Sequence, residues 1–312
     1  MNELIVLGQL GPFTLTAYAL CLMAGAAAAI ALTVYLGRKT PGVNACLSMG
    51  MAAVIGAVIG GRLVYCLTQW EFILVDLGGA AFMAQPWQGG YNMYGAVLGG
   101  LAGVAIYAGA TKKPACALMD LAAPGAALTI LAGRLGEAFT SQGLGAYVDS
   151  EALHLFPFAV ENSWGDWQLP VFAYEAAAAL IVMVVCLCLL RGGKRPAGRV
   201  AEVFLALISL CQILLESLRA DEFIRFGFVK FNMLAAAVVL GCVIGLSVWR
   251  QVKRGGWKPW QIFLLILFAL SIVVVILIEF ALDKSPIDNR LLYAVMALML
   301  TLMGVSVLRE GK

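Results

Sequence analysis

The chain alternates between long apolar runs and short polar stretches. A helix needs about 20 apolar residues to cross the hydrocarbon core of a bilayer. Nine runs come close to or exceed this length, near residues 13–35, 46–68, 92–110, 115–135, 171–190, 200–219, 233–249, 259–282 and 290–308. A further run at 72–84 contains Asp76 and two glycines, so we interpret it as interfacial or re-entrant. The pattern predicts an all-α polytopic membrane protein with about nine transmembrane helices.

Composition agrees with this fold class and narrows the chemistry. Of 312 residues, 62% are hydrophobic and 12% are charged, whereas a soluble domain carries about 25% charged residues. The eight cysteines lie in or beside the apolar runs, so no disulfide framework is expected. With His154 as the single histidine and no P-loop or zinc motif, we expect no metal site, no cofactor and no nucleic-acid partner.

The charged residues sort by loop, and this sorting predicts the orientation. Basic residues gather on one side of the predicted spans: Arg38, Lys39, Lys112, Lys113, Arg191, Lys194, Arg195, Arg199, Arg250, Lys253, Arg254, Lys258, Arg309 and Lys312. Acidic residues dominate the other side: Glu3, Glu71, Asp76, Asp149, Glu151, Glu161, Asp166, Asp221, Glu222, Asp283 and Asp288. Because basic loops stay in the cytoplasm, we expect the N-terminus and loop 137–169 outside and the C-terminus inside; loop 220–232 is mixed. No basic residue precedes the first span, which argues against a cleaved signal peptide.

Three arginines lie near the predicted outer ends of apolar helices: Arg62, Arg134 and Arg219. A guanidinium at mid-membrane costs about 2.5 kcal/mol or more, and less near an interface, so such a residue usually serves a site or a partner. An anionic lipid headgroup is the first ligand to consider. We therefore expect the three side chains to share one cavity that opens toward the outer leaflet.

Each polar segment also has a purely structural interpretation. Arg134 and Glu137 are three residues apart and can pair on one helical face, either as a simple salt bridge or as part of a phosphate site. Glu175 near the start of a span can act as a helix-dipole partner. The glycine-rich run 89–100, with Asn92 and Tyr94 at its outer mouth, can be a tightly packed helix start.

In this order, the segments resemble the prolipoprotein diacylglyceryl transferase family across roughly residues 10–248. The resemblance rests on these segments: Gly11-Pro12 with Tyr18, Gly61-Arg62-Leu63-Val64-Tyr65, the glycine run 89–100, Asp120 to Pro124, Gly133-Arg134-x-Gly136, Tyr174-Glu175 and Glu216-x-x-Arg219. It divides the chain into a seven-helix domain at 10–250, with the outer loop 137–169, and two additional helices in 251–312.

The resemblance implies transfer of a diacylglyceryl group from phosphatidylglycerol to the lipobox cysteine of preprolipoproteins, whose signal peptide would be a partner, in the bacterial cytoplasmic membrane. It implies catalytic roles for Arg134, Glu137, Tyr94 and Arg219. It implies substrate binding by the remaining motif residues: Tyr18, Arg62, Asn92, Gln142, Gly145, Tyr174 and Glu175.

The chain departs from the family pattern at the proton-handling positions. Tyr94 and Leu169 replace family histidines, Glu137 and Thr140 replace asparagines, and Gln142 replaces a glutamate. Four hypotheses stay open: an active transferase with a rewired base, an enzyme acting on another acceptor or headgroup, a non-catalytic lipid- or lipoprotein-binding protein, and a transporter.

Overall fold

The computed structural model describes residues 5–77, 79–193, 195–221, 225–226 and 229–309, which excludes Glu3, Lys194, Glu222 and Lys312 of the charged residues considered above. Within this part of the chain, eight segments are long and apolar enough to cross a membrane. The first, Ala17–Thr68, has 52 residues and bends at Arg38–Gly42, so it supplies two long helices. The chain is an all-α polytopic membrane protein, as the hydropathy pattern predicted.

The chain forms two compact units, Met1–Ala201 and Glu202–Lys312, and each is described by itself. The helices of the first unit are α1 (Ala17–Gly37), α2 (Val43–Thr68), α3 (Trp70–Val75), α4 (Met93–Ala110), α5 (Ala115–Gly136) and α6 (Val171–Arg191). Helix α7 (Arg199–Leu218) begins at the end of this unit and continues into the second. The second unit also holds α8 (Phe231–Gly255), α9 (Pro259–Lys284) and α10 (Asn289–Arg309).

Short hairpins and turns connect the helices. Strands β1 (Val6–Leu10) and β2 (Phe13–Thr16) pair around a turn in which Gly11 has a φ of +60°, so the first long helix begins at Ala17 and not near residue 13. Strands β3 (Val160–Glu161) and β4 (Trp167–Gln168) pair in the loop before α6, and β5 (Arg225–Phe226) pairs with β6 (Val229–Lys230) before α8. The run at 72–84 forms the end of α3 and the 3-10 turn Ala80–Ala84; a second 3-10 turn, Pro86–Gln88, follows it.

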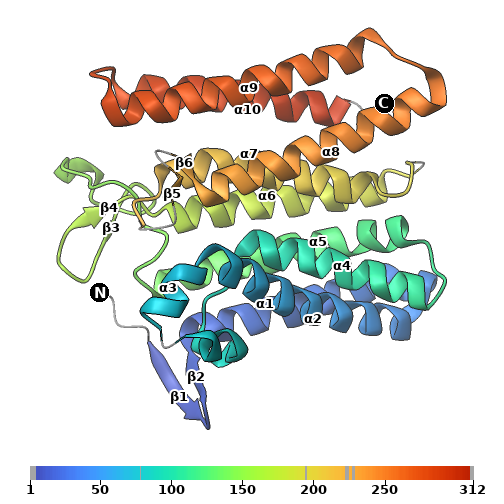
Figure 1. Cartoon of the computed structure of the whole chain (residues 1–312), viewed down its shortest axis with the longest axis horizontal. Helices are drawn as coiled ribbons and strands as arrows, with labels where there is room; N and C mark the ends of the chain where they lie inside the picture. Colours follow the sequence, from blue (N-terminus) through green and yellow to red (C-terminus); the bar gives the residue numbers. More distant parts are fainter. Residues whose placement is uncertain (1–4, 78, 194, 222–224, 227–228, 310–312) are drawn as a thin grey trace. The chain divides into compact units, whose positions relative to one another are not determined.

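Glycines bring α2 and α4 into backbone contact, and Figure 1 shows these helices side by side in the first unit. A Cβ added at Gly99 would lie 2.2 Å from the carbonyl oxygen of Gly56, and one added at Gly60 would lie 2.4 Å from that of Gly95. Small residues allow such close approach between membrane helices. The packing interpretation of the glycine run is therefore confirmed for Gly95 and Gly99.

Asp120 on α5 fixes the start of α7 across about 80 residues of sequence. Its carboxylate accepts hydrogen bonds from the backbone N–H of Gly198 (2.7 Å) and of Ala201 (2.9 Å). The first N–H groups of a helix have no partner within that helix, and an aspartate normally supplies one from the N-cap position. Here the cap comes from another helix, which explains a buried carboxylate in an apolar span.

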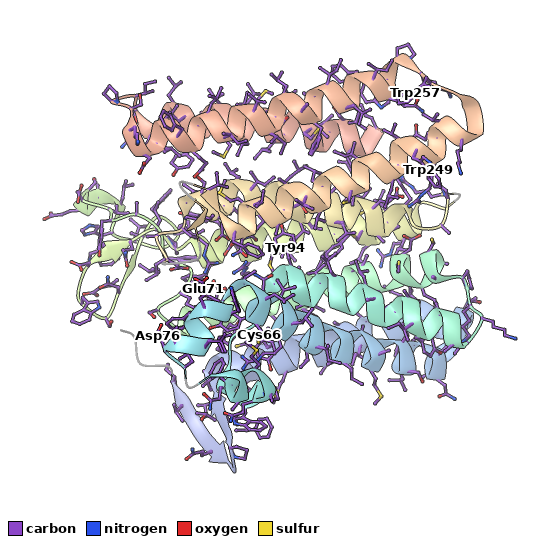
Figure 2. All side chains as sticks on the ribbon, in the orientation of Figure 1. Cys66, Glu71, Asp76, Tyr94, Trp249 and Trp257 are labelled. Carbon is purple, nitrogen blue, oxygen red and sulfur yellow. The ribbon has the colours of Figure 1, made fainter. Side chains whose placement is uncertain are left out.

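In the second unit, α9 and α10 form an antiparallel pair (Figure 1). Trp249 near the end of α8 and Trp257 just before α9 are exposed and lie at one end of the unit (Figure 2). The ammonium nitrogen of Lys253 lies over the Trp249 ring, 4.1 Å from the ring centroid. Exposed tryptophans beside lysine are typical of the boundary between lipid and water.

Candidate functional site

Arg134, in the last turn of α5, is the centre of a buried ionic cluster. Its Nη1 lies 2.5 Å from Oε1 of Glu137, and its Nη2 lies 3.3 Å from Oε1 of Glu175 on α6. The same Nη2 donates to Sδ of Met93 in the first turn of α4 at 3.3 Å. The side chains of Arg134, Glu137 and Glu175 are 11%, 6% and 3% exposed. We call these three residues the Arg134 cluster; three helix ends meet there.

The cluster confirms one predicted pair and adds another. Arg134 and Glu137 were expected to pair from their i,i+3 spacing, and they do. Glu175 lies in the second turn of α6, and its carboxylate faces the guanidinium of Arg134 instead of serving only the helix dipole. One guanidinium between two carboxylates means that an incoming phosphate must compete with them for Arg134.

The loop after α5 turns back against Glu137. The backbone at Gly143 has a φ of +77°, and a Cβ placed there would lie 2.4 Å from Oε2 of Glu137. The carbonyl of Gly143 accepts a hydrogen bond from the N–H of Phe172 at 2.8 Å, and Oγ1 of Thr140 donates to the carbonyl of Glu137 at 2.8 Å. Gly143 was not singled out from the sequence, although its place between Gln142 and Gly145 marked a glycine-rich turn.

Three residues predicted to bind substrate shape the loop 137–169. The N–H of Gly145 donates to the carbonyl of Leu169 at 2.8 Å, and the hydroxyl of Tyr174 donates to the carbonyl of Pro157 at 2.8 Å. The side chain of Gln142 is exposed, while its N–H donates to Oγ1 of Thr140 at 3.1 Å. These contacts tie both ends of the loop to the helix ends that carry the Arg134 cluster.

Tyr94 and Asn92 lie at the start of α4. Oδ1 of Asn92 accepts from the N–H of Gly95 at 3.1 Å, so Asn92 caps the helix. Tyr94 is 3% exposed and follows Met93, the residue that contacts Arg134. Figure 2 places Tyr94 at the same end of the first unit as Cys66, Glu71 and Asp76.

Arg62 on α2 organises the segment between α3 and α4. Its guanidinium donates to four backbone carbonyls, those of Phe82, Gln85, Gly89 and Gly90. It also lies 4.6 Å from the centroid of the Phe82 ring, and its side chain is buried. Since five N–H donors in a rigid fork suit several carbonyls at once, Arg62 fixes the path of this segment.

Tyr91 and Tyr18 complete the surroundings of these helix ends. The hydroxyl of Tyr91 donates to the carbonyl of Pro86 at 2.8 Å, and partial burial raises the pKa of Tyr91, so its phenol stays protonated at neutral pH. Tyr18, in the first turn of α1, packs against Gly136 at the end of α5: a Cβ there would lie 3.2 Å from the Tyr18 ring.

Arg219 belongs to the second unit and follows the last residue of α7. Its Nε and Nη2 lie 2.9 Å and 2.6 Å from Oδ2 of Asp221, and its side chain is 1% exposed. Fully buried Glu216 accepts from Nε2 of Gln212 at 2.5 Å and from Nδ2 of Asn232 at 3.2 Å. The single cavity expected for Arg62, Arg134 and Arg219 stays a prediction.

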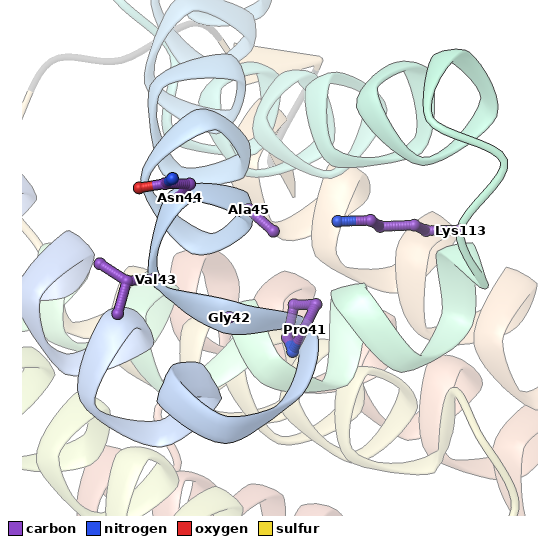
Figure 3. Close-up of a pocket in the computed structure, with 6 residues that line it drawn as sticks. All are labelled: Pro41, Gly42, Val43, Asn44, Ala45 and Lys113. Atoms are coloured by element: carbon purple, nitrogen blue, oxygen red, sulfur yellow. The ribbon is translucent and has the colours of Figure 1, made fainter.

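A pocket lies at the other end of α5. It occupies the bend between α1 and α2, close to Lys113, which precedes α5 (Figure 3). Its lining consists of Pro41, Gly42, Val43, Asn44, Ala45 and Lys113. A helix of 22 residues is about 33 Å long, so this pocket is separate from the Arg134 cluster. Among the described residues, no group of three or more His, Cys, Asp or Glu side chains is arranged to hold a metal ion.

Fold and site together define a polytopic membrane protein with buried, paired arginines at the ends of its helices. The chain belongs to the prolipoprotein diacylglyceryl transferase family, whose sequence profile matches residues 5–250. Helices α9 and α10 lie beyond the matched residues, toward the C-terminus.

Relatives with the full name phosphatidylglycerol–prolipoprotein diacylglyceryl transferase are found in several bacteria. The one from Streptococcus pneumoniae serotype 4 is 26% identical over 79% of this chain and 94% of its own length. The one from Corynebacterium glutamicum is 29% identical over 81% of this chain and 84% of its own length. The one from Streptococcus uberis is 26% identical, covering 79% and 95% respectively. Their names are those of transferases, so the family is one of enzymes.

Proposed function

We propose that this protein transfers the diacylglyceryl group of phosphatidylglycerol to prolipoproteins in the bacterial plasma membrane, the reaction for which its relatives are named. The observation that carries the proposal is the Arg134 cluster: a buried guanidinium held by Glu137 and Glu175 where three helix ends meet. A planar guanidinium binds phosphate through two parallel hydrogen bonds. In surroundings with little water, that interaction is stronger than it would be at an exposed surface.

The proposed reaction is a displacement at the glycerol carbon that carries the phosphate ester. The thiol of the acceptor cysteine loses its proton, and its sulfur forms a new C–S bond with the diacylglyceryl group. The C–O bond to the phosphate breaks, and glycerol phosphate leaves as an anion. Because the thiolate comes from the substrate, the protein needs no cysteine of its own. Arg134 would stabilise the negative charge that grows on the leaving group. For Arg219, in the second unit, the family resemblance implies a catalytic role as well.

We assign the proton-accepting role to Glu137. When the lipid phosphate takes the place of a carboxylate on Nη1 of Arg134, the carboxylate of Glu137 is released beside the bound lipid. Glu175 would keep Nη2 of Arg134 in position. Tyr94 is the second candidate, but the phenol of a free tyrosine, with a pKa near 10, is a poor base at neutral pH.

The other predicted residues would shape and line the lipid site. Tyr18 packs on the end of α5, and Arg62 and Asn92 set the segment before α4 and its first turn. Gly145 and Tyr174 would hold the loop 137–169, and the exposed amide of Gln142 would contact a substrate directly.

The decisive experiment is rescue of a bacterial strain depleted of its own transferase, with lipoprotein lipidation measured by mass. The wild-type chain should restore the diacylglyceryl mass increase. Arg134→Lys should not, because lysine lacks the planar fork. The control is Arg250→Lys, which changes a half-exposed arginine paired with Glu202 at 2.5 Å and should retain rescue. Rescue by Arg134→Lys as strong as by the wild type would refute the phosphate role of Arg134. Phosphatidylglycerol binding without any transfer by the wild-type chain would favour a non-catalytic lipid-binding protein.

A further inference from the structure

Ser217, between Glu216 and Arg219, is contacted by both helices beyond the family match. Its hydroxyl donates a hydrogen bond to Oε1 of Glu279 on α9, and its backbone carbonyl accepts one from the hydroxyl of Tyr293 on α10 at 3.4 Å. The carboxylate of Glu279 is buried. A buried carboxylate in an apolar helix is costly and usually serves a site or a partner.

The rest of the α7 terminus is held just as closely. Nζ of Lys230 donates to the carbonyl of Glu216 at 2.7 Å and also to the carbonyl of Arg219. The last carbonyls of a helix have no partner within the helix, so Lys230 caps the turn that leads to Arg219. Glu216 and Arg219 are fixed by their own side-chain contacts, whereas Ser217 connects the same turn to α9 and α10.

We propose that α9 and α10 position Arg219, with Glu279 and Tyr293 as positioning residues that act through Ser217. The hydrogen bond from Ser217 to Glu279 and the one from Tyr293 to the Ser217 carbonyl together fix the rotation of the last turn of α7. That rotation sets the direction in which the backbone delivers the guanidinium of Arg219. The family match ends within α8, and the two helices that follow supply a second support for one of the arginines inside the match.

The first test measures the position of Arg219 without relying on the proposed function. Phenylglyoxal modifies accessible arginines, and the modified site is located by peptide mass. In the purified wild-type chain, Arg219 should react slowly because its side chain is 1% exposed. Ser217→Ala and Glu279→Leu should each raise its modification rate about 10-fold, and the double variant should react no faster than either single one, because both remove the same contact.

Conservative and control variants separate positioning from general loosening. Glu279→Gln keeps an acceptor oxygen for Ser217 and should react nearly as slowly as the wild type. Ser271→Ala removes a buried hydroxyl that donates a hydrogen bond within α9, to the carbonyl of Leu267 at 2.7 Å, and should change nothing at Arg219. The modification rate of Arg134 should stay constant throughout. An unchanged Arg219 rate in Glu279→Leu and Ser217→Ala, or a rise in Ser271→Ala of equal size, would overturn the proposal.

The second test reads transfer activity and therefore rests on the proposed function. The kcat for diacylglyceryl transfer should fall several-fold, at unchanged melting temperature, in each of Ser217→Ala, Glu279→Leu and Tyr293→Phe. Glu279→Gln should retain most of the wild-type kcat. If the wild-type chain shows no transfer activity, only the proposed function is refuted. The positioning role is then still tested by the phenylglyoxal modification rates of Arg219. Full kcat in all three variants would refute the link between the added helices and catalysis.

Discussion

Gly143 allows the loop after α5 to pack directly against the proposed base, and Gly143→Ala should displace that base. The added Cβ would lie 2.4 Å from Oε2 of Glu137 and 2.7 Å from Cβ of Phe172, whereas ordinary contacts begin near 3.4 Å. The carboxylate must therefore move by about 1 Å, and a misplacement of that size can cost about 100-fold in rate. This corresponds to about 2.7 kcal/mol of transition-state stabilisation.

Gly165→Ala is the matched control, because it adds the same methyl group with the same backbone strain. Gly165 lies in the same loop with a φ of +85°, and the nearest atom to its added Cβ is 3.9 Å away. Alanine in this backbone region costs about 1–2 kcal/mol, so Gly165→Ala should lose about that much stability in thermal unfolding, and Gly143→Ala should lose more because its Cβ also overpacks the loop. Initial transfer rates with phosphatidylglycerol vesicles and a lipobox peptide should fall about 100-fold in Gly143→Ala only. Equal rates in the two variants would refute the role of Glu137 as a precisely held base.

Three further measurements test the site, the packing and the orientation. Glu137→Gln keeps the size of the side chain but removes the base, so the transfer rate should fall about 100-fold or more, whereas Tyr94→Phe should matter less; full activity in both would exclude both as the base. Gly99→Ala should lower the free energy of unfolding by about 1–3 kcal/mol through overpacking against α2, partly offset by about 1 kcal/mol of helix propensity. The control is Gly109→Ala on the same helix, whose added Cβ meets nothing within 4 Å, and it should be neutral or stabilising. A cysteine placed at Gly193 should react with an impermeant thiol reagent only from the cytoplasmic side once native thiols are blocked, and labelling from outside alone would reverse the predicted topology.

The long helices could be predicted because one property, hydropathy over about 20 residues, decides them. The bend between α1 and α2 was also visible, since Arg38, Lys39 and Pro41 interrupt the apolar pattern. The hairpins could not be predicted in this way. Residues Phe13–Thr16 are apolar enough to extend the first span, yet they pair with β1 because Gly11 allows a tight turn. A window average cannot separate a short apolar strand from the start of a helix.

Part of the site followed from local spacing, and part did not. Arg134 and Glu137 are neighbours on one helical face, so their pairing was predictable. Glu175 pairs with the same guanidinium from a different helix, and no spacing rule connects residues 134 and 175. Gly143 matters because of the atom it faces, Oε2 of Glu137, and such a contact depends on the path of the whole loop. Residue types identified the participants, but tertiary structure determined their partners.

The three arginines that looked equivalent in the sequence have different electrostatic surroundings. Arg134 and Arg219 lie against carboxylates at 2.5 Å and 2.6 Å, so an incoming phosphate must compete with Glu137 or Asp221 for them. Arg62 instead donates to backbone carbonyl oxygens, which accept its hydrogen bonds without cancelling its charge. A cation that keeps its charge attracts an anionic headgroup over a longer range. We therefore infer a division of roles in which Arg62 holds the segment before α4 and contributes attraction, while Arg134 exchanges a carboxylate for phosphate when the lipid binds. Under this inference, a glutamate at position 137 would neutralise Arg134 at rest and accept a proton after phosphate has displaced it.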